Sequence, residues 1–138
     1  MKNPIDVEIY ILIARLFFSL LFIISGLNHL LNLERMAAYV RKKNLPVPKV
    51  VVTVSGVAII FGGFSILLGL LVETGALILT VFLVITAFFF HNFWEKDDPK
   101  EKVNEMNHFL KDIALAGASL LIWYFGTGPF SLGSPFGL

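Results

Sequence analysis

Long hydrophobic runs, broken by few charges, make up most of the chain. A helix that spans a membrane needs about 20 apolar residues, because the hydrocarbon core is about 30 Å thick. Four segments meet this requirement, at residues 7–31, 50–72, 75–94 and 106–125. The fourth segment is the most polar, since Lys111 and Asp112 lie near its start.

The apolar segments are expected to be helices rather than strands. Membrane β-strands are about 10 residues long and alternate strictly, whereas residues 81–85 are all apolar. The stretch 33–49 between the first two segments places Met36, Tyr39 and Val40 opposite much of its charge, which is typical of a short interfacial helix. We therefore expect an all-α membrane protein.

The expected architecture is a four-transmembrane-helix antiparallel bundle with a short interfacial helix between helices 1 and 2. It forms one transmembrane domain, 1–138, with a C-terminal tail at 126–138. An acidic start (Asp6, Glu8) and a long apolar run favour a retained anchor over a cleaved signal peptide.

Composition limits the function classes. Hydrophobic residues make up 57% of the 138 residues and charged residues only 15%, against about 25% charged in soluble domains. A net charge of +1 provides no excess of basic residues for binding nucleic acid. The absence of cysteine excludes disulfide, iron–sulfur and thiolate chemistry within this chain. Any redox chemistry therefore needs a bound cofactor or a partner protein.

Basic residues predict the orientation in the membrane. Four spans place the connectors 32–49 and 95–105 on one side, with both termini and the turn at Glu73 on the other. The first side carries Arg35, Arg41, Lys42, Lys43, Lys49, Lys96, Lys100, Lys102 and Lys111. The second side has only Lys2. The positive-inside rule then puts both connectors in the cytoplasm and both termini outside the inner or plasma membrane.

Polar residues suited to ligand binding gather on one membrane face. His29 ends the first predicted helix, His91 ends the third and His108 begins the fourth, so antiparallel packing brings them to similar depth. The candidate ligand-binding residues there are Asn28, His29, His91, Asn92, Trp94, His108 and Asp112. The spacing i, i+4 predicts that Asp112 orients His108.

Three interpretations of this face stay open. Histidine and asparagine can hydrogen-bond quinone carbonyls while the aromatic residues near His91 stack on the ring, and neutral imidazoles can also ligate haem iron or a metal ion. The third interpretation is a set of interfacial side chains that cap helices and bind water. We rank quinone above haem or a metal, and we assign neither metal ligands nor catalytic residues.

Arg15 lies about two turns inside the first predicted helix, where a cation is costly and normally has a partner. It shares a helical stripe with Ser19 and His29. Glu73 and Glu8 are the predicted partners, so Arg15 and Glu73 form a candidate buried charge pair. Such a pair serves either helix packing or the handling of ligands or protons.

Glycines in the second segment predict close helix packing, because small residues let backbones approach in lipid. These residues are Gly56, Gly62, Gly63 and Gly69. The contact is expected within the chain or between two copies of it, so the expected partners are the lipid bilayer and either a partner protein or a homo-oligomer.

An ordered set of short motifs covers nearly the whole chain. They are Ala14-Arg15-Leu16, Ser25-Gly26-Leu27-Asn28-His29-Leu30, Met36-Ala37-Ala38-Tyr39, Leu45-Pro46-Val47-Pro48, Gly62-Gly63 with Gly69, His91-Asn92-Phe93-Trp94, and the stretches 107–117 and 128–132. In this order they resemble the DoxX family of small four-helix membrane proteins. The resemblance implies an oxidoreductase role, related to the small subunits of a thiosulfate:quinone oxidoreductase and linked to thiol and oxidative-stress complexes.

Two functions of different classes follow. The first is a subunit of an oxidoreductase complex that binds quinone or another small ligand at the His/Asn cluster on the cytoplasmic side. The alternative is a non-enzymatic membrane anchor or assembly subunit for a partner protein. Whether the chain is itself catalytic stays open.

Overall fold

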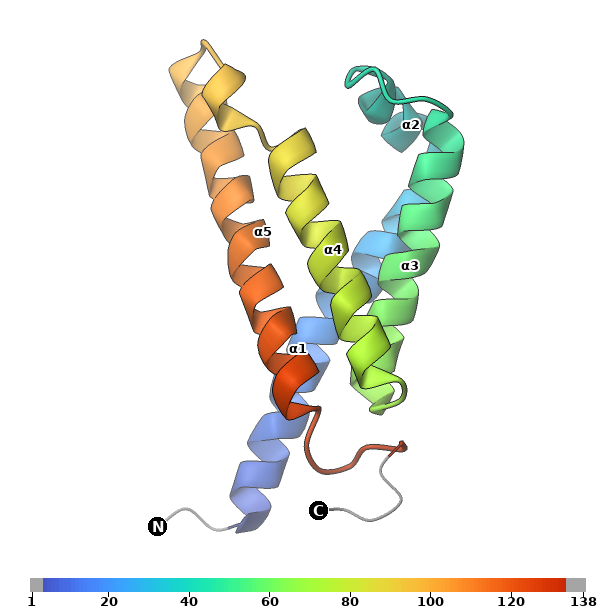
Figure 1. Cartoon of the computed structure of the whole chain (residues 1–138), viewed down its shortest axis with the longest axis vertical. Helices are drawn as coiled ribbons and strands as arrows, with labels where there is room; N and C mark the ends of the chain where they lie inside the picture. Colours follow the sequence, from blue (N-terminus) through green and yellow to red (C-terminus); the bar gives the residue numbers. More distant parts are fainter. Residues whose placement is uncertain (1–3, 134–138) are drawn as a thin grey trace.

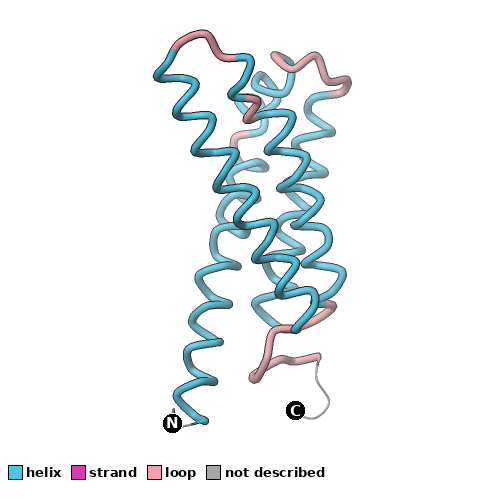
Figure 2. The backbone as a smooth tube through the Cα atoms, turned by 60° about the vertical axis from the view of Figure 1, so that its left-hand side comes forward, coloured by secondary structure: helices cyan, strands magenta, loops and turns pink. Residues whose placement is uncertain are grey.

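The computed structural model describes residues 4–133, and its regular elements are all helical (Figures 1 and 2). In chain order they are α1 (Pro4–Leu31), α2 (Leu33–Arg41), α3 (Pro48–Leu68), α4 (Val72–Phe90), the 3₁₀ helix η1 (Phe93–Glu95) and α5 (Pro99–Phe125). The predicted all-α fold, with a short helix between the first two long helices, is confirmed. Lys2 and the end of the predicted tail, 134–138, lie outside the described residues.

Three of the described helices are long and apolar enough to cross a membrane, and they are α1, α3 and α4. Helix α5 is of similar length, with 27 residues, but its first half is charged. It nevertheless packs along α4, which makes it the fourth long helix of the bundle (Figure 1).

Two predicted boundaries around the last connector are corrected, and α3 also ends at Leu68 rather than near residue 72. Helix α5 begins at Pro99 rather than near residue 106, because the Asp98 carboxylate caps it by accepting the Glu101 amide at 2.9 Å. Much of the predicted loop 95–105 is therefore helix. Helix α4 ends at Phe90 rather than near residue 94, and η1 then leads the chain toward α5.

The helices form two arms that separate toward one end (Figure 1). Helices α1, α2 and α3 make one arm, and α4 and α5 make the other. The arms meet where α3 crosses α4 at Gly62. A Cβ atom added there would lie 2.6 Å from Leu79 Cγ, so any other residue would force Leu79 or the two helices to shift. Within the second arm, Ser119 Oγ donates to the Ala76 carbonyl at 2.8 Å.

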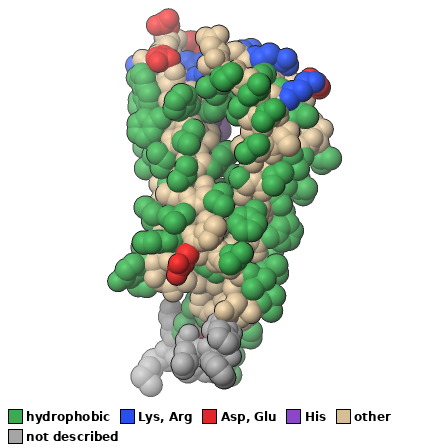
Figure 3. All heavy atoms as spheres, turned by 45° about the vertical axis from the view of Figure 1, so that its right-hand side comes forward, with side chains coloured by type: hydrophobic (Ala, Val, Ile, Leu, Met, Phe, Trp, Pro, Cys, Tyr) green, Lys and Arg blue, Asp and Glu red, His purple; other side chains and the backbone are tan. Residues whose placement is uncertain are grey.

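We call the end where the arms separate the basic end, because Lys and Arg side chains gather there (Figure 3). It carries α2, η1 and the start of α5, whereas α1 begins and α5 ends at the opposite end (Figures 1 and 2). Between the ends, the face seen in Figure 3 is mostly hydrophobic, with large apolar side chains exposed on the outside of the bundle. This distribution is expected for a surface that contacts lipid.

At the opposite end, Arg15 is buried, with 4% of its surface exposed. Its guanidinium donates hydrogen bonds of 3.2, 2.6, 2.7 and 3.5 Å to the carbonyl oxygens of Ile66, Leu67, Pro129 and Phe130. The last carbonyls of a helix lack intrahelical donors and carry partial negative charge, so the end of α3 satisfies this cation. Glu73 is exposed, and its prediction as a buried charge is wrong.

Candidate functional site

A cavity of about 410 Å³ lies between the two arms, in the half of the bundle nearest the basic end. Small-molecule sites typically measure about 300–1,000 Å³. Its lining is mainly apolar and includes Leu21, Phe22, Met36, Val52, Phe82 and Leu83. The cavity follows from the packing, because the tight contact at Gly62 holds the arms together at one end only.

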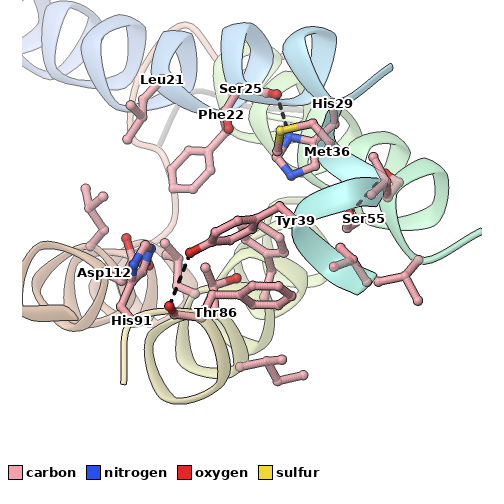
Figure 4. Close-up of a pocket in the computed structure, with 18 of the residues that line it drawn as sticks. Leu21, Phe22, Ser25, His29, Met36, Tyr39, Ser55, Thr86, His91 and Asp112 are labelled. Carbon is pink, nitrogen blue, oxygen red and sulfur yellow. Dashed lines mark hydrogen bonds and ion pairs between the residues drawn. The ribbon is translucent and has the colours of Figure 1, made fainter. Parts of the chain in front are cut away.

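Polar side chains from every long helix face this cavity. They are Ser25 and His29 from α1, Tyr39 from α2, Ser55 from α3, Thr86 from α4, His91 at its end, and Lys111 and Asp112 from α5. In Figure 4, His91 and Asp112 lie together on one side, Ser25 and His29 lie on another, and the Tyr39 ring extends between them. The cavity therefore has hydrogen-bonding groups on separate walls.

The His91 imidazole makes the densest polar contacts. Its Nδ1 lies 2.7 Å from Glu105 Oε2, and its Nε2 lies 3.6 Å from Asp112 Oδ2. The ring also stacks on His108, with 5.0 Å between the ring centroids. Asp112 is buried, and Lys111 Nζ lies 3.5 Å from its other oxygen, Oδ1.

Local sequence explains this arrangement. His91 caps the end of α4, where the chain leaves the helix. Glu105, His108 and Asp112 follow one another at spacings of three and four, so they share one face of α5. Sequence reasoning missed Glu105, although this spacing would have indicated it.

The predicted partner of Asp112 is corrected by the same contacts. The imidazole nitrogen opposite the Asp112 carboxylate belongs to His91, whereas His108 Nδ1 lies 3.4 Å from Lys111 Nζ. The i, i+4 spacing does place His108 and Asp112 on one face of α5. The packing of α4 against α5, however, brings the His91 imidazole to the Asp112 carboxylate.

His29 lines a different part of the cavity. Its Nδ1 lies 2.8 Å from the Ser25 carbonyl oxygen. A carbonyl only accepts hydrogen bonds, so Nδ1 carries the proton and, in the neutral ring, Nε2 is an acceptor. His29 is therefore suited to accept a hydrogen bond from a hydroxyl group.

Side chains from α2 and the end of α4 close the cavity toward the basic end. Tyr39 stacks on Phe90 at 5.6 Å between ring centroids and donates to the Phe90 carbonyl at 3.4 Å. Lys43 Nζ donates to Asn92 Oδ1 at 2.6 Å. Burial and the nearby Glu105 carboxylate raise the pKa of Tyr39. We call the contacts of Tyr39 with Phe90 and of Lys43 with Asn92 the roof of the cavity.

A second, polar hollow of about 450 Å³ lies at the roof. It is lined by Tyr39, Lys42, Lys43, Asn44, Asn92, Glu95, Lys96 and Glu105. Its charged lining contrasts with the apolar cavity.

The predicted site residues thus separate into groups. His29, His91 and Asp112 line the cavity, Asn92 belongs to the roof, and His108 supports His91. The other two predicted site residues, Asn28 and Trp94, do not line the cavity. Asn28 is exposed and accepts a hydrogen bond from Asn32, the residue between α1 and α2. Trp94 is exposed and packs among phenylalanines.

Among residues 4–133, no group of three or more His, Asp or Glu side chains is arranged to hold a metal ion. The polar groups are instead distributed around an apolar space, which suits an organic ligand.

Comparisons with known proteins agree with the motifs. The model of the DoxX family matches residues 10–92, more than half of the chain. Inner membrane protein YqjF of Escherichia coli (strain K12) is 30% identical over 128 residues, which cover 91% of this chain and 90% of the relative. Inner membrane protein YphA of the same organism is 27% identical over 124 residues, covering 90% and 88%. No solved structure matches the chain.

Proposed function

Because this chain belongs to the DoxX family and has inner membrane proteins as relatives, we propose that it binds a quinone or quinol in the cavity between its arms, as the membrane subunit of an oxidoreductase complex. The observation that carries the proposal is an apolar cavity of about 410 Å³ with titratable groups on separate walls. A quinone has the same character, with a flat apolar ring and oxygen atoms at opposite ends.

The side chains fit the reduced form of such a ligand. His29 presents an acceptor, Nε2, to a quinol hydroxyl, because Ser25 holds its other nitrogen as the donor. His91 and Asp112 supply hydrogen-bonding groups at another wall. Phe82 and Leu83 belong to the apolar lining that the ring would contact.

The basic end lies in the cytoplasm by the positive-inside rule, so the cavity lies in the cytoplasmic half of the membrane. Figure 3 shows a hollow in the hydrophobic outer face with a histidine inside it. A lipid-soluble ligand would reach the cavity from the bilayer by such an opening. The chain has no cysteine, and we assign the electron-carrying group to a partner protein.

The test measures ligand-dependent stabilisation of the purified protein. A short-chain ubiquinol is titrated while the melting temperature is followed, for the wild type and for His29→Ala, His91→Ala and Asn28→Ala. Asn28→Ala is the matched control, because Asn28 is a polar residue near the same end of α1 that does not line the cavity.

We expect His29→Ala to weaken quinol binding about fivefold, since one hydrogen bond contributes about 1 kcal/mol. Asn28→Ala should bind like the wild type. A wild-type protein that shows no stabilisation by quinone or quinol would refute the proposal.

One observation favours the alternative, an anchor or assembly subunit. The first turns of α5 extend beyond the end of α4 at the basic end and carry a dense set of exposed charges (Figure 1). Such a surface suits a soluble partner protein. A variant without all three histidines distinguishes the two functions. If quinol binding is the function, activity of the complex is lost although crosslinking to the partner in native membranes is kept; if anchoring is the function, both are kept.

A further inference from the structure

We propose that Glu105, His91 and Asp112 form a proton path between the polar hollow at the roof and the ligand cavity. The inference rests on the proposed function for the identity of the ligand. Interconversion of a quinone and its quinol exchanges two protons with every two electrons, and the proposal concerns only the protons.

The position of His91 between two compartments is the first support. Glu105 lines the polar hollow, whereas Asp112 lines the apolar cavity. His91 contacts both carboxylates, one with each ring nitrogen. A contact that served packing alone would not need a carboxyl group in each compartment.

The distances are the second support. Proton transfer takes place across about 2.6–3.2 Å between heavy atoms. The contact between His91 Nδ1 and Glu105 Oε2, at 2.7 Å, is already in this range. The contact between His91 Nε2 and Asp112 Oδ2, at 3.6 Å, reaches it with a small movement of the ring. Imidazole suits the middle position, because it can accept a proton at one nitrogen and release one from the other.

The transfer balances in protons and charge. A ligand oxygen anion takes the proton of the Asp112 carboxyl, so an O–H bond forms on the ligand and one breaks on Asp112. The His91 Nε2–H proton replaces it, His91 Nδ1 takes a proton from the Glu105 carboxyl, and Glu105 recovers one from water in the polar hollow. One proton has then moved to the ligand, and no residue of the path has changed its charge.

The other titratable and charged groups around the path come from three elements. They are His108 and Lys111 on α5, Tyr39 on α2 with Lys42 and Lys43 just after it, and Glu95 in η1, which bonds Asn92, with Lys96 just after it. Lys111 Nζ lies 3.5 Å from Asp112 Oδ1, and its charge stabilises the carboxylate that exists briefly between loss of the Asp112 proton to the ligand and its replacement from His91.

The experiment follows protonation of a bound dye after a pH jump. Hydroxynaphthoquinone is a coloured quinone whose absorbance changes when its hydroxyl ionises. It is bound to the full chain in lipid nanodiscs, and stopped-flow mixing then lowers the pH. The variants are Glu105→Gln and Asp112→Asn, with Glu101→Gln as the control, because Glu101 is an exposed carboxylate one turn earlier on α5.

We expect Glu105→Gln and Asp112→Asn to slow protonation of the bound dye about a hundredfold, the lower range of general acid–base effects, and Glu101→Gln to leave the rate unchanged. His91→Gly should slow it similarly, and added imidazole should restore the rate. A purely structural role for His91 would not produce this rescue.

The outcomes separate the two proposals. If the dye binds and every variant protonates it at the wild-type rate, the proton path is wrong and the proposed function stands. If neither the dye nor a ubiquinol binds the wild type, the proposed function is wrong and the path loses its ligand. Glu105 is partly exposed, so Glu105→Gln keeps the test decisive even if Asp112→Asn fails to fold.

Discussion

Replacing Arg15 with methionine removes the cation that joins the end of α3 to the C-terminal loop. Two of its hydrogen bonds are short, at 2.6 Å to the Leu67 carbonyl and 2.7 Å to the Pro129 carbonyl. Hydrogen bonds from charged donors contribute about 1.5–3 kcal/mol each in water-soluble proteins, but averages in membrane proteins are nearer about 0.6 kcal/mol because the unfolded chain also finds partners. We expect a loss of about 3 kcal/mol, since Arg15→Met also leaves the two carbonyls unsatisfied.

The assay is unfolding in mixed micelles, followed by tryptophan fluorescence as the fraction of denaturing detergent rises. Arg41→Met is the matched control, because Arg41 is an exposed arginine on α2, and we expect a change below about 0.5 kcal/mol. Glu73→Gln should also be nearly neutral. A loss below about 1 kcal/mol for Arg15→Met, or an equal loss for Glu73→Gln, would refute the assignment of carbonyl oxygens as the partners of Arg15.

Two further predictions concern packing and pH. Gly62→Ala should lower the free energy of unfolding by about 1–3 kcal/mol, because its Cβ would lie 2.6 Å from Leu79 Cγ; Gly117→Ala, whose Cβ would meet no atom within 4 Å, should be neutral or slightly stabilising in the same assay. The raised pKa of Tyr39 means that the folded protein keeps this proton above pH about 10, where the unfolded chain releases it, so stability falls as pH rises through this range. Tyr39→Phe should make the alkaline loss of stability shallower, and an unchanged pH profile would show that Tyr39 does not contribute.

The start of α5 shows where hydrophobic pattern is a poor guide. Residues 99–105 are too polar to show an apolar stripe, so the pattern placed the helix start near residue 106. The sequence did contain the relevant signal, because Asp98 followed by Pro99 and then Glu101 is typical of a capped helix start. Local capping chemistry, rather than hydrophobic burial, sets this boundary.

The histidines show that positions at helix ends predict a shared end of the bundle but do not predict which side chains touch. Helix count placed His29, His91 and His108 at one end of the bundle, and the structure brings His91 and His108 into contact there. It does not place His29 in that stack. His29 instead faces Phe82, with 6.3 Å between the ring centroids, on another wall of the cavity.

The partners of buried polar groups depend on contacts that the sequence does not display. Lys43 and Asn92 are 49 positions apart, and the roof forms only because α2 folds back toward the end of α4. Arg15 similarly found backbone carbonyls rather than a carboxylate. Carbonyl acceptors exist at every residue, so no residue pattern marks the ones that a helix end leaves free.

The sequence by itself determined the all-helical membrane fold, the short helix between the first two long ones, and the end of the bundle at which histidines and basic residues gather. These properties follow from segment length and order, because each residue advances a helix by about 1.5 Å. Only the tertiary structure decided that the arms separate into a cavity and that His91 lies between Glu105 and Asp112. The angle between the arms depends on how closely α3 and α4 approach at Gly62, and such packing is a property of pairs of surfaces rather than of any one segment.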